Sequence, residues 1–593
     1  MASKHRELVR KRTLWLFVLF ALLFLGLTGR LAYVQVLNRK EYQDWAKKIR
    51  FRDIAIPASR GTIYDRNGQP LAVSIEASGV YACRREVLNE AKTVAEVAQV
   101  LSQDPAALKL KFEGDASIVW LARQIDPRAA DKLSEINGEC PGLGVQRDPK
   151  RVYPGRSLAS HVLGFVSVKN TLNAGLVTEG VEGIESVLND ELTGADGLLR
   201  TELDVKRRAI PETRHKVRSP VDGKDVYLTI DLAIQHIAET ALARMVEKYH
   251  PEKACAIVMD PRTGEIYALA NVPSYDPNAA RSFAEENWRN HAVSDLYEPG
   301  STLKTVTVAA ALNDGLSPHA VVACCTGHER IKGGRLTCSL HRPFLSGHGG
   351  VDSYKIIRHS CNIGAAHLGL RLGARKLYHY EKEFGLLEKT GAGLPGEARN
   401  FTLPPDDWCR IRIANVGFGQ GIAITPLQIA CAYSVIANGG QYVQPRIVRE
   451  LRDADGNVIS PFEPRVLRQV VSRRTAAEMT QMLVGCVEEG TGKTARIPGR
   501  TVAGKTGSAE IAMPRGGFEP GAFVASFIGF APADNPRLVI AVVVTRPKGS
   551  HWGATVAAPV FKEIGEKALW YLKVPADAPA GPEKQDGDRK GLV

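Results

Sequence analysis

A serine and a lysine three residues apart are the first residues of this sequence whose types and spacing suit chemistry. The segment EPGSTLKTVTVAAAL, residues 298–312, places Ser301 after a glycine and Lys304 one helical turn later. We expect both side chains at the start of a helix and on one face of it. A lysine with a lowered pKa can take the proton of a serine hydroxyl, so the pair predicts a nucleophile and its base. Alone, however, Ser-x-x-Lys is more often an N-cap serine beside an exposed lysine.

A hydroxyl and an amide follow in RHSCNIGAAHLGLRLG, residues 358–373. Ser360 and Asn362 precede a helical run there, and we expect them to project from a turn. Together they suit a proton relay and a clamp for a substrate amide. A single Ser-x-Asn is usually an N-cap, so its weight comes from its order and spacing after Ser301.

The sequence Lys-Thr-Gly occurs twice. Residues Lys505, Thr506 and Gly507 lie in TVAGKTGSAEIAM, a β-type stretch that precedes two buried strands. An edge strand there would offer a cation and backbone N–H groups to a substrate carboxylate, and the N–H groups of Ser301 and Ser508 would form an oxyanion hole.

The other copy begins at Lys389, at the end of the helical stretch KLYHYEKEFGLLEKTGAGLPGE. Gly391 and Gly393 look like helix stop signals, which favours a solvated helix end over a catalytic role. The residues GRTVAGKT, 499–506, also match the phosphate-binding formula G-x-x-x-x-G-K-T. That motif needs a buried strand before it and a helix after it, and neither pattern is present, so we do not assign nucleotide binding.

The three elements in this order resemble the motif set of the penicillin-binding protein and serine β-lactamase superfamily. Further segments resemble class B penicillin-binding proteins, and within them the division-specific FtsI or penicillin-binding protein 3 type most closely. The first group is similar to the non-catalytic pedestal: RGTIYDRNG (60–68), RVYPGRSLASHVLGFV (151–166) and GVEGIESVLNDELTG (180–194). The second group is similar to the division-specific branch: EPGSTLK (298–304), FGQGIAITPLQIACAYSVIANGG (418–440) and GSHWGATVAAPVFKEI (549–564).

This resemblance implies a peptidoglycan D,D-transpeptidase that cross-links stem pentapeptides during septal wall synthesis and is acylated by β-lactams. Ser301 would attack the penultimate D-alanine carbonyl, D-alanine would leave, and the amine of a neighbouring stem would resolve the acyl-enzyme. It assigns Lys304 as the base, Ser360 as a proton relay and Asn362 as the holder of the donor amide. The substrate carboxylate would be bound by the strand residues Lys505, Thr506, Gly507 and Ser508.

Several alternatives remain at this point. The elongation-specific protein 2 type and a non-catalytic β-lactam sensor or scaffold share the same motifs. A β-lactamase is less favoured, because its deacylating pattern Glu-x-x-Leu-Asn occurs only at Glu185 to Asn189, far upstream of Ser301. The resemblance implies no cofactor and no nucleic acid, and it suggests an FtsW-type glycan polymerase and division proteins as partners.

Cysteine and histidine gather between the first two motifs, in CCTGHERIKGGRLTCSLHRPFLSGHGG. A disulfide from Cys324 or Cys325 to Cys338 is the favoured reading for an oxidising compartment, and structural zinc is the alternative. The spacing lacks paired C-x-x-C, so no metal ligands are assigned. The remaining candidates of this cluster are His328, His341 and His348.

The N-terminus predicts a single membrane anchor. Five basic residues in the first twelve precede the uncharged run LWLFVLFALLFLGLTG, residues 14–29, and Arg30 is followed by further apolar residues to Leu37. Basic residues before an apolar span indicate a cytoplasmic N-terminus, so the rest of the chain would be extracytoplasmic at the inner or plasma membrane.

The expected fold is an α/β (α+β) transpeptidase domain of the penicillin-binding protein and β-lactamase type, with an antiparallel sheet flanked by helices. It is joined to a strand-rich pedestal and one N-terminal transmembrane helix. The expected boundaries are a basic tail (1–12), the anchor (13–37), the pedestal of the dimerisation type (38–235), the transpeptidase domain (236–573) and a disordered tail (574–593). The length of 593 residues and net charge of +13 are compatible with this organisation.

Overall fold

The computed structural model describes residues 2–84, 86–112, 118–136, 140–171, 175–204, 209–338, 347–400, 402–513 and 517–578. The chain forms two compact units. The first contains Met1–Ala58, Glu76–Lys150 and Ala195–Asp222, and the second contains Ser59–Ile75, Arg151–Gly194 and Gly223–Val593. Both units are therefore built from separate stretches of sequence.

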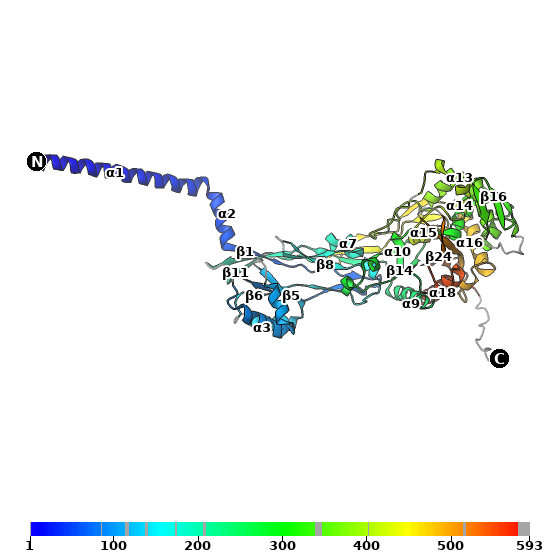
Figure 1. Cartoon of the computed structure of the whole chain (residues 1–593), viewed down its shortest axis with the longest axis horizontal. Coiled ribbons are helices and arrows are strands. Elements are labelled where there is room, and N and C mark those ends of the chain that lie inside the picture. The colour runs from blue at the N-terminus through cyan, green and yellow to red at the C-terminus, as the bar shows by residue number, and fades with distance from the viewer. Residues whose placement is uncertain are drawn as a thin grey trace. The chain divides into compact units, whose positions relative to one another are not determined.

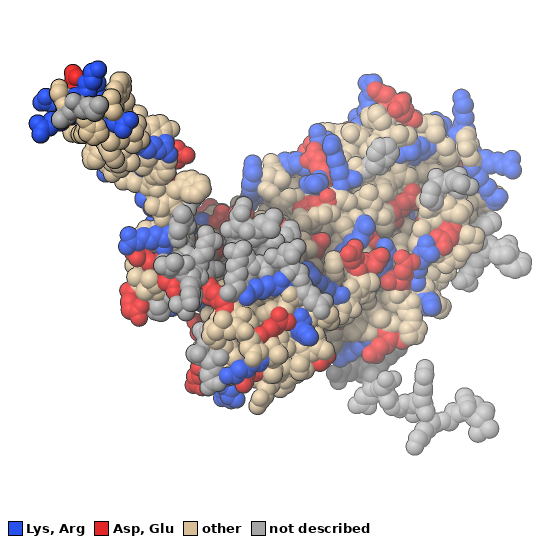
Figure 2. Space-filling view, turned by 60° about the vertical axis from the view of Figure 1, so that its left-hand side comes forward, with Lys and Arg blue, Asp and Glu red and all other residues tan. Residues whose placement is uncertain are grey.

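The first unit begins with the helix expected as an anchor. Helix α1 (Ala2–Ala32) continues through a π-helical turn, η1 (Tyr33–Leu37), and α2 (Arg39–Arg50) follows. The segment Ser3–Leu37 is long and apolar enough to cross a membrane. Figure 2 shows basic side chains at the free end of this helix and an uncharged surface along its middle. This distribution fits membrane anchoring.

Two antiparallel sheets complete the first unit. Strand β10 (Gly197–Leu203) pairs with β1 (Phe51–Ile56) and β11 (Ala209–Arg218). Strand β4 (Ser78–Cys83) lies between β5 (Ile118–Ile125) and β6 (Leu143–Arg147). Apolar residues of this second sheet share a core with the helices α3 (Glu90–Leu101), α4 (Pro105–Lys111) and α5 (Pro127–Ile136).

A five-stranded antiparallel sheet organises the second unit, in the order β14-β13-β25-β24-β23. These strands are β13 (Lys253–Met259), β14 (Ile266–Val272), β23 (Ala503–Ala512), β24 (Phe518–Ala531) and β25 (Leu538–Thr545). Figure 1 shows this sheet and its helices in the C-terminal part of the chain. The pair of buried strands expected after Lys505 is confirmed as β24 and β25, and β23 is the edge strand that the sequence predicted.

Both faces of this sheet are buried, which explains its nearly continuous apolar strands. Along β13, Ala254, Ala256 and Val258 belong to one core with helices α9 (Leu232–Tyr249) and α18 (Ala558–Tyr571). The alternate residues, from Cys255 to Met259, face a second core that includes the apolar helix α15 (Pro426–Ala437). Successive strand residues point to opposite faces, so one strand contributes to both cores.

The helices around the second core carry the first two motifs. They are α11 (Lys304–Asn313), α12 (Ser353–Arg358), α13 (Asn362–Glu383), α14 (Arg410–Gly417), α15 (Pro426–Ala437) and α16 (Arg473–Glu488). Helix α13 ends at Glu383, six residues before Lys389, so the helical stretch expected to reach Lys389 is shorter than the sequence predicted. Gly385, with a φ of +79°, follows the helix and already ends it.

A second sheet has six strands, in the order β21 (Val458–Pro461), β20 (Val448–Arg452), β12 (Asp225–Leu228), β2 (Ile63–Tyr64), β3 (Pro70–Ile75) and β7 (Lys150–Val152). The residues Asp65 to Gly68 form the turn between β2 and β3, in which Gly68 N–H donates to Asp65 O.

Shorter elements complete the unit. They are α6 (Ser160–Leu163), β8 (Val166–Thr171), β9 (Gly175–Gly180), α7 (Gly183–Val187), α8 (Asn189–Thr193), α10 (His291–Ser294), β15 (Ala323–Cys325), β16 (His328–Ile331), β17 (Gly334–Thr337), β18 (Gly349–Val351), β19 (Gln441–Val443), β22 (Val466–Gln469) and α17 (Gly553–Val556).

The expected disordered tail begins within the described residues. Val574 N–H donates to Leu569 O, and Asp577 accepts hydrogen bonds from Thr501, so residues 574–577 pack on the unit. The rest of that tail, residues 579–593, lies outside the described residues.

Candidate active site

Ser301 lies in a short 3-10 helix, η4 (Gly300–Leu303), that leads directly into α11. Gly300 has a φ of +54°, and its N–H donates to Gly419 O at 2.9 Å. The Glu298 carboxylate accepts the N–H of Gly421 at 2.8 Å. The segments EPGSTLK and FGQG are thus held together by one backbone hydrogen bond and one to a carboxylate, and a Cβ at Gly419 would meet Gly300 O at 2.0 Å. The glycine at 419 is required for this close approach.

Lys304 is fully buried and connects the first two motifs. Its Nζ lies 2.9 Å from Ser301 Oγ, 3.2 Å from Ser360 Oγ and 2.8 Å from Ser360 O. It also lies 2.6 Å from Asn362 Oδ1. The predicted nucleophile, base, relay and amide are therefore brought into one hydrogen-bonded group.

The pKa of Lys304 is lowered to about 7, first by burial and then by the positive charge of Lys505. No carboxylate is among its hydrogen-bond partners in the described chain. A neutral amine has two N–H donors and one lone pair. The two carbonyl oxygens, Ser360 O and Asn362 Oδ1, can accept both donors, which leaves the lone pair facing the hydroxyl of Ser301. This arrangement suits a general base.

Ser360 occupies the turn between α12 and α13, with a φ of +58° that is uncommon for a residue other than glycine. This conformation turns both its carbonyl and its hydroxyl toward Lys304. Asn362 is the first residue of α13, and its Nδ2 donates to Thr337 O at 2.9 Å. The predicted turn is confirmed for Ser360, whereas Asn362 already belongs to the helix and is fixed at both ends of its amide.

Lys505 is buried on the edge strand β23. Its Nζ donates to Thr506 O at 3.0 Å and lies 3.4 Å from Thr506 Oγ1. Burial lowers the pKa of Lys505, as expected for a cation that has no carboxylate partner among the described residues. A bound carboxylate would supply that missing counter-charge.

The next three residues of β23 fix how close the strand lies to Ser301. The hydroxyls of Thr506 and Thr491 are 2.9 Å apart. A Cβ at Gly507 would come within 2.3 Å of Ser526 Oγ and 3.0 Å of Thr302 Cγ2, so glycine allows β23 to pack against η4. Ser508 Oγ accepts the N–H of Gly553 at 3.0 Å. Gly553 belongs to the GSHWGAT segment, and the sequence analysis gave it no role.

Tyr433 is another residue that the sequence analysis missed. Its hydroxyl donates to Thr302 O at 3.0 Å and is 2.8 Å from Thr305 Oγ1, so helix α15 supports the turn that carries Ser301. The only sequence signal was its place in the segment 418–440, and a buried tyrosine in an apolar helix is usually explained by packing.

The alternative motifs lie in different surroundings. Lys389 is exposed, and Thr390 binds the Glu397 carboxylate through its N–H and its hydroxyl, both at 2.8 Å. The 499–506 segment enters the strand β23 and is not followed by a helix, unlike a phosphate-binding loop.

Glu185, the first residue of the β-lactamase-like pattern, is fully buried in an ion-pair network. Its carboxylate accepts from Arg60 Nε and Arg151 Nε, each at 2.6 Å, and from Tyr153 OH at 3.2 Å. Arg60 also donates to Asn189 Oδ1 at 3.0 Å. The three pedestal-like segments of the sequence therefore meet at one carboxylate, whose role is structural.

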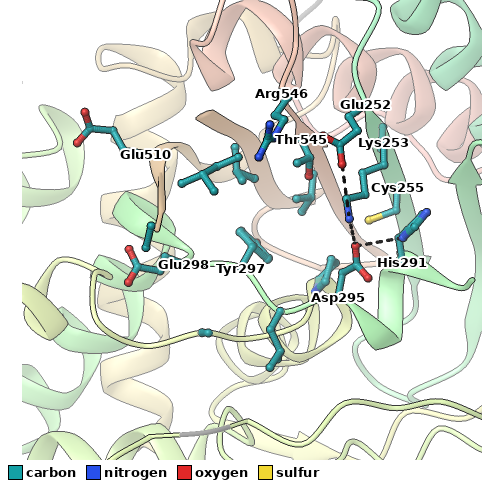
Figure 3. Close-up of a pocket in the computed structure, with 18 residues that line it drawn as sticks. Glu252, Lys253, Cys255, His291, Asp295, Tyr297, Glu298, Glu510, Thr545 and Arg546 are labelled. Carbon is teal, nitrogen blue, oxygen red and sulfur yellow. Dashed lines mark hydrogen bonds and ion pairs between the residues drawn. The ribbon is translucent and has the colours of Figure 1, made fainter. Parts of the chain in front are cut away.

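A pocket of about 360 Å³ lies beside this site (Figure 3). Its lining includes Tyr297 and Glu298, which precede Ser301, and Glu510, which follows the third motif. The lining does not include Ser301, Lys304 or Lys505. Within the pocket, the Asp295 carboxylate contacts both Lys253 and His291, and its Oδ2 lies 2.6 Å from Lys253 Nζ. This pocket is therefore distinct from the group around Lys304.

Two family models match the chain. The penicillin binding protein transpeptidase domain covers residues 254–566, and the penicillin-binding protein dimerisation domain covers residues 55–228. The chain therefore belongs to the class B penicillin-binding proteins, which combine these two domains.

Individual relatives extend over almost the whole chain. Stage V sporulation protein D of Bacillus subtilis is 35% identical over 95% of this chain and 86% of that protein. The probable peptidoglycan D,D-transpeptidase PbpC of Pseudomonas aeruginosa is 31% identical over 99% of this chain and 100% of that protein. Penicillin binding protein 3 of Mycobacterium tuberculosis, solved in complex with aztreonam, has a TM-score of 0.67 and 29% identity, covering 89% of this chain and 99% of that one.

Proposed function

We propose that this protein is a peptidoglycan D,D-transpeptidase that works through an acyl-enzyme on Ser301. The observation that carries the proposal is the position of Lys304, whose buried Nζ lies 2.9 Å from Ser301 Oγ and contacts both Ser360 and Asn362. The names of the relatives support the same reaction class, since PbpC is described as a probable peptidoglycan D,D-transpeptidase.

In the first half-reaction the free amine of Lys304 takes the proton of Ser301. The Ser301 Oγ then forms a bond to the carbonyl carbon of the penultimate D-alanine of a stem pentapeptide. The C–N bond to the terminal D-alanine breaks, and its nitrogen receives the proton from Lys304 through the hydroxyl of Ser360.

The second half-reaction repeats these steps in reverse order. An amine of a neighbouring stem gives its proton to Lys304 and attacks the ester carbonyl, and Ser301 leaves with the proton restored. Asn362 holds the donor amide, while Lys505, Thr506 and Ser508 bind the terminal carboxylate. Gly507 keeps the strand close to the serine. Backbone N–H groups of Ser301 and Ser508 stabilise the oxyanion in both steps.

Acylation by a β-lactam tests this proposal. The full-length chain in detergent is incubated with a penicillin, and its intact mass is measured beside that of Ser301→Ala. A stable adduct on the unaltered protein alone is the expected result. A folded protein that forms no adduct contradicts the proposal, and rapid loss of the adduct indicates a β-lactamase instead.

Septal wall synthesis is the finer part of the proposal. It is supported by the segments similar to the FtsI type and by the likeness to a penicillin binding protein 3. A fluorescent fusion at midcell and filamentous growth after depletion are expected. Rounded cells and signal along the side wall would favour the elongation-specific alternative.

The proposed setting is the inner or plasma membrane, with the N-terminus in the cytoplasm and the chain after Leu37 outside it. The apolar segment Ser3–Leu37 and the basic residues before it support this topology. Protease added to spheroplasts should therefore cleave an epitope at the C-terminus and spare one at the N-terminus. Association with an FtsW-type glycan polymerase stays a prediction.

A further inference from the structure

Four metal-binding side chains converge beneath the second motif. They are Cys325, Cys338, His348 and Cys361, whose ligand atoms all lie within 4.8 Å of one another. The three cysteines are almost completely buried. Cys361 is the residue between Ser360 and Asn362, and the sequence analysis did not include it in the cysteine and histidine cluster. His341 of that cluster lies outside the described residues.

The distances match a tetrahedral site. His348 Nδ1 is 3.5 Å from both Cys325 Sγ and Cys338 Sγ, and the sulfurs of Cys338 and Cys361 are 3.9 Å apart. Zinc bonds of about 2.3 Å to sulfur and about 2.05 Å to nitrogen would place sulfurs about 3.8 Å apart and sulfur and nitrogen about 3.6 Å apart in a tetrahedron. These three distances thus agree with a zinc tetrahedron, and all four ligand atoms lie within 4.8 Å of one another.

The chain builds this arrangement from several local structures. Strands β15 and β18 pair Cys325 with Gly349, next to His348. Gly347, which precedes His348, packs closely against the backbone of Cys325. A Cβ at Gly347 would lie 2.2 Å from Cys325 O. Cys338 N–H donates to Gly327 O at 2.8 Å, and Cys361 caps helix α13 by accepting the N–H of Gly364. Backbone contacts thus position the ligands.

A disulfide does not account for these residues. All ten cysteines are free thiols in the structure, so the disulfide expected from Cys324 or Cys325 to Cys338 is not formed. Cys324 is exposed, unlike Cys325 beside it. A disulfide would also use only two of the three buried thiols. His348, whose Nδ1 lies 3.5 Å from both Cys325 Sγ and Cys338 Sγ, would take no part in such a bridge.

We propose that Cys325, Cys338, His348 and Cys361 bind a structural zinc ion. Three thiolates and one imidazole are a preferred zinc set, and four protein ligands close the site to substrate. The earlier assignment of no metal ligands rested on irregular sequence spacing, which the fold overcomes by bringing Cys361 from the second motif into the cluster.

The zinc ion would act as a clamp on the second motif. Cys361 joins Ser360 to Asn362 directly, and Asn362 Nδ2 binds Thr337 O, next to the ligand Cys338. The ion would therefore fix both the turn that carries Ser360 and the acceptor that holds Asn362. This positioning role rests on the proposed function of the site, whereas zinc binding itself does not.

Metal content tests the binding. The full-length chain is purified in detergent without chelators from zinc-supplemented medium and analysed by inductively coupled plasma mass spectrometry. One zinc per chain is expected. Protein grown with cobalt should show the visible bands of tetrahedral Co²⁺ with thiolate charge transfer. Cys325→Ser and His348→Ala should lose the metal, while Cys324→Ser, on the exposed neighbour, should keep it.

Acylation after metal exchange tests the clamp. Removal of zinc by a chelator should slow acylation by a fluorescent penicillin about tenfold, and added Zn²⁺, but not Mg²⁺, should restore it. Folded protein that carries no zinc, or a disulfide between any two of these cysteines found by peptide mass mapping, overturns the site. Zinc that is bound but leaves acylation unchanged on removal overturns the clamp alone. Protein that holds zinc but is never acylated contradicts the proposed function instead.

Discussion

Lys304 Nζ donates to Asn362 Oδ1 at 2.6 Å, across 58 positions of sequence. This bond joins the helix that follows the candidate nucleophile to the helix that begins at the second motif. It has a chemical consequence, because an amide oxygen accepts a hydrogen bond without requiring a positive charge on the donor. Asn362 can therefore hold Lys304 in place both as the ammonium and as the neutral amine.

The rate of acylation should depend on pH through Lys304, whose pKa is lowered to about 7 by burial and by Lys505. The free amine is the reactive form, so the rate should increase with pH below about 7 and level off above it. Stopped-flow measurement with a chromogenic β-lactam between pH 5.5 and pH 9 gives this profile. Lys304→Arg should lose acylation throughout, since a guanidinium stays protonated. A flat profile would exclude Lys304 as the base.

Gly553→Ala should impair the third motif without unfolding the protein. A Cβ at this position would lie 2.3 Å from both Gly507 O and Ser526 O, so β23 must shift near Ser508. A displacement of this kind reduces acylation by about 100-fold. Gly485→Ala is the matched control, since its Cβ would meet only Arg358 side-chain atoms, at 3.8 Å. Equal acylation rates in the two variants would show that the Gly553 contact does not position the site.

Glu185→Ala should strongly destabilise the second unit. The substitution leaves the buried guanidinium groups of Arg60 and Arg151 without their counter-charge, a loss of about 3–5 kcal/mol in the free energy of unfolding. Urea denaturation followed by circular dichroism measures it. Glu191→Ala breaks the half-exposed pair with Lys224 and should cost less than about 1 kcal/mol. Similar losses in both variants would contradict the importance of the buried network.

Glu381 in α13 should make stability depend on pH. Burial raises its pKa to about 8, and neither carboxyl oxygen has a hydrogen-bond partner in the described chain. The unfolded carboxyl has an ordinary pKa near 4.5, so this group contributes stability below that pH and loses it as pH rises toward 8, by roughly 4 kcal/mol in all.

Glu381→Gln removes that ionisation. Its melting temperature relative to the unaltered protein should increase from pH 5 to pH 8, as measured by differential scanning calorimetry. Glu388→Gln, at an exposed position, should show no such trend. A constant difference between Glu381→Gln and the unaltered protein at both pH values would show that Glu381 ionises normally.

Much of the second unit could be predicted from local patterns. Helix α9, the hairpin of β13 and β14 and the strand pair of β24 and β25 follow from apolar periodicity and turn residues, because burial of a helix face or of a strand leaves a regular trace in sequence. The same holds for the apolar segment at the N-terminus, where hydropathy alone defines a possible membrane span.

The candidate catalytic residues could also be chosen from the sequence, because side-chain chemistry and motif order are local properties. Their functional state was decided by the tertiary structure. The lowered pKa of Lys304 results from packing that removes water and from the approach of Lys505, 201 positions later in the chain. The left-handed backbone conformation at Ser360 could not be predicted, because the residue that adopts it is not a glycine.

The sequence by itself determined the apolar N-terminal segment, the principal strands of the sheet with their helices, and the residue types of the candidate site. Only the tertiary structure decided which residues meet: Glu185 with two arginines from distant segments, Gly553 with Ser508, and Cys361 with the cysteine and histidine cluster. Such contacts depend on long-range chain packing. The spacing of residues along the sequence therefore does not show which of them become neighbours in the folded chain.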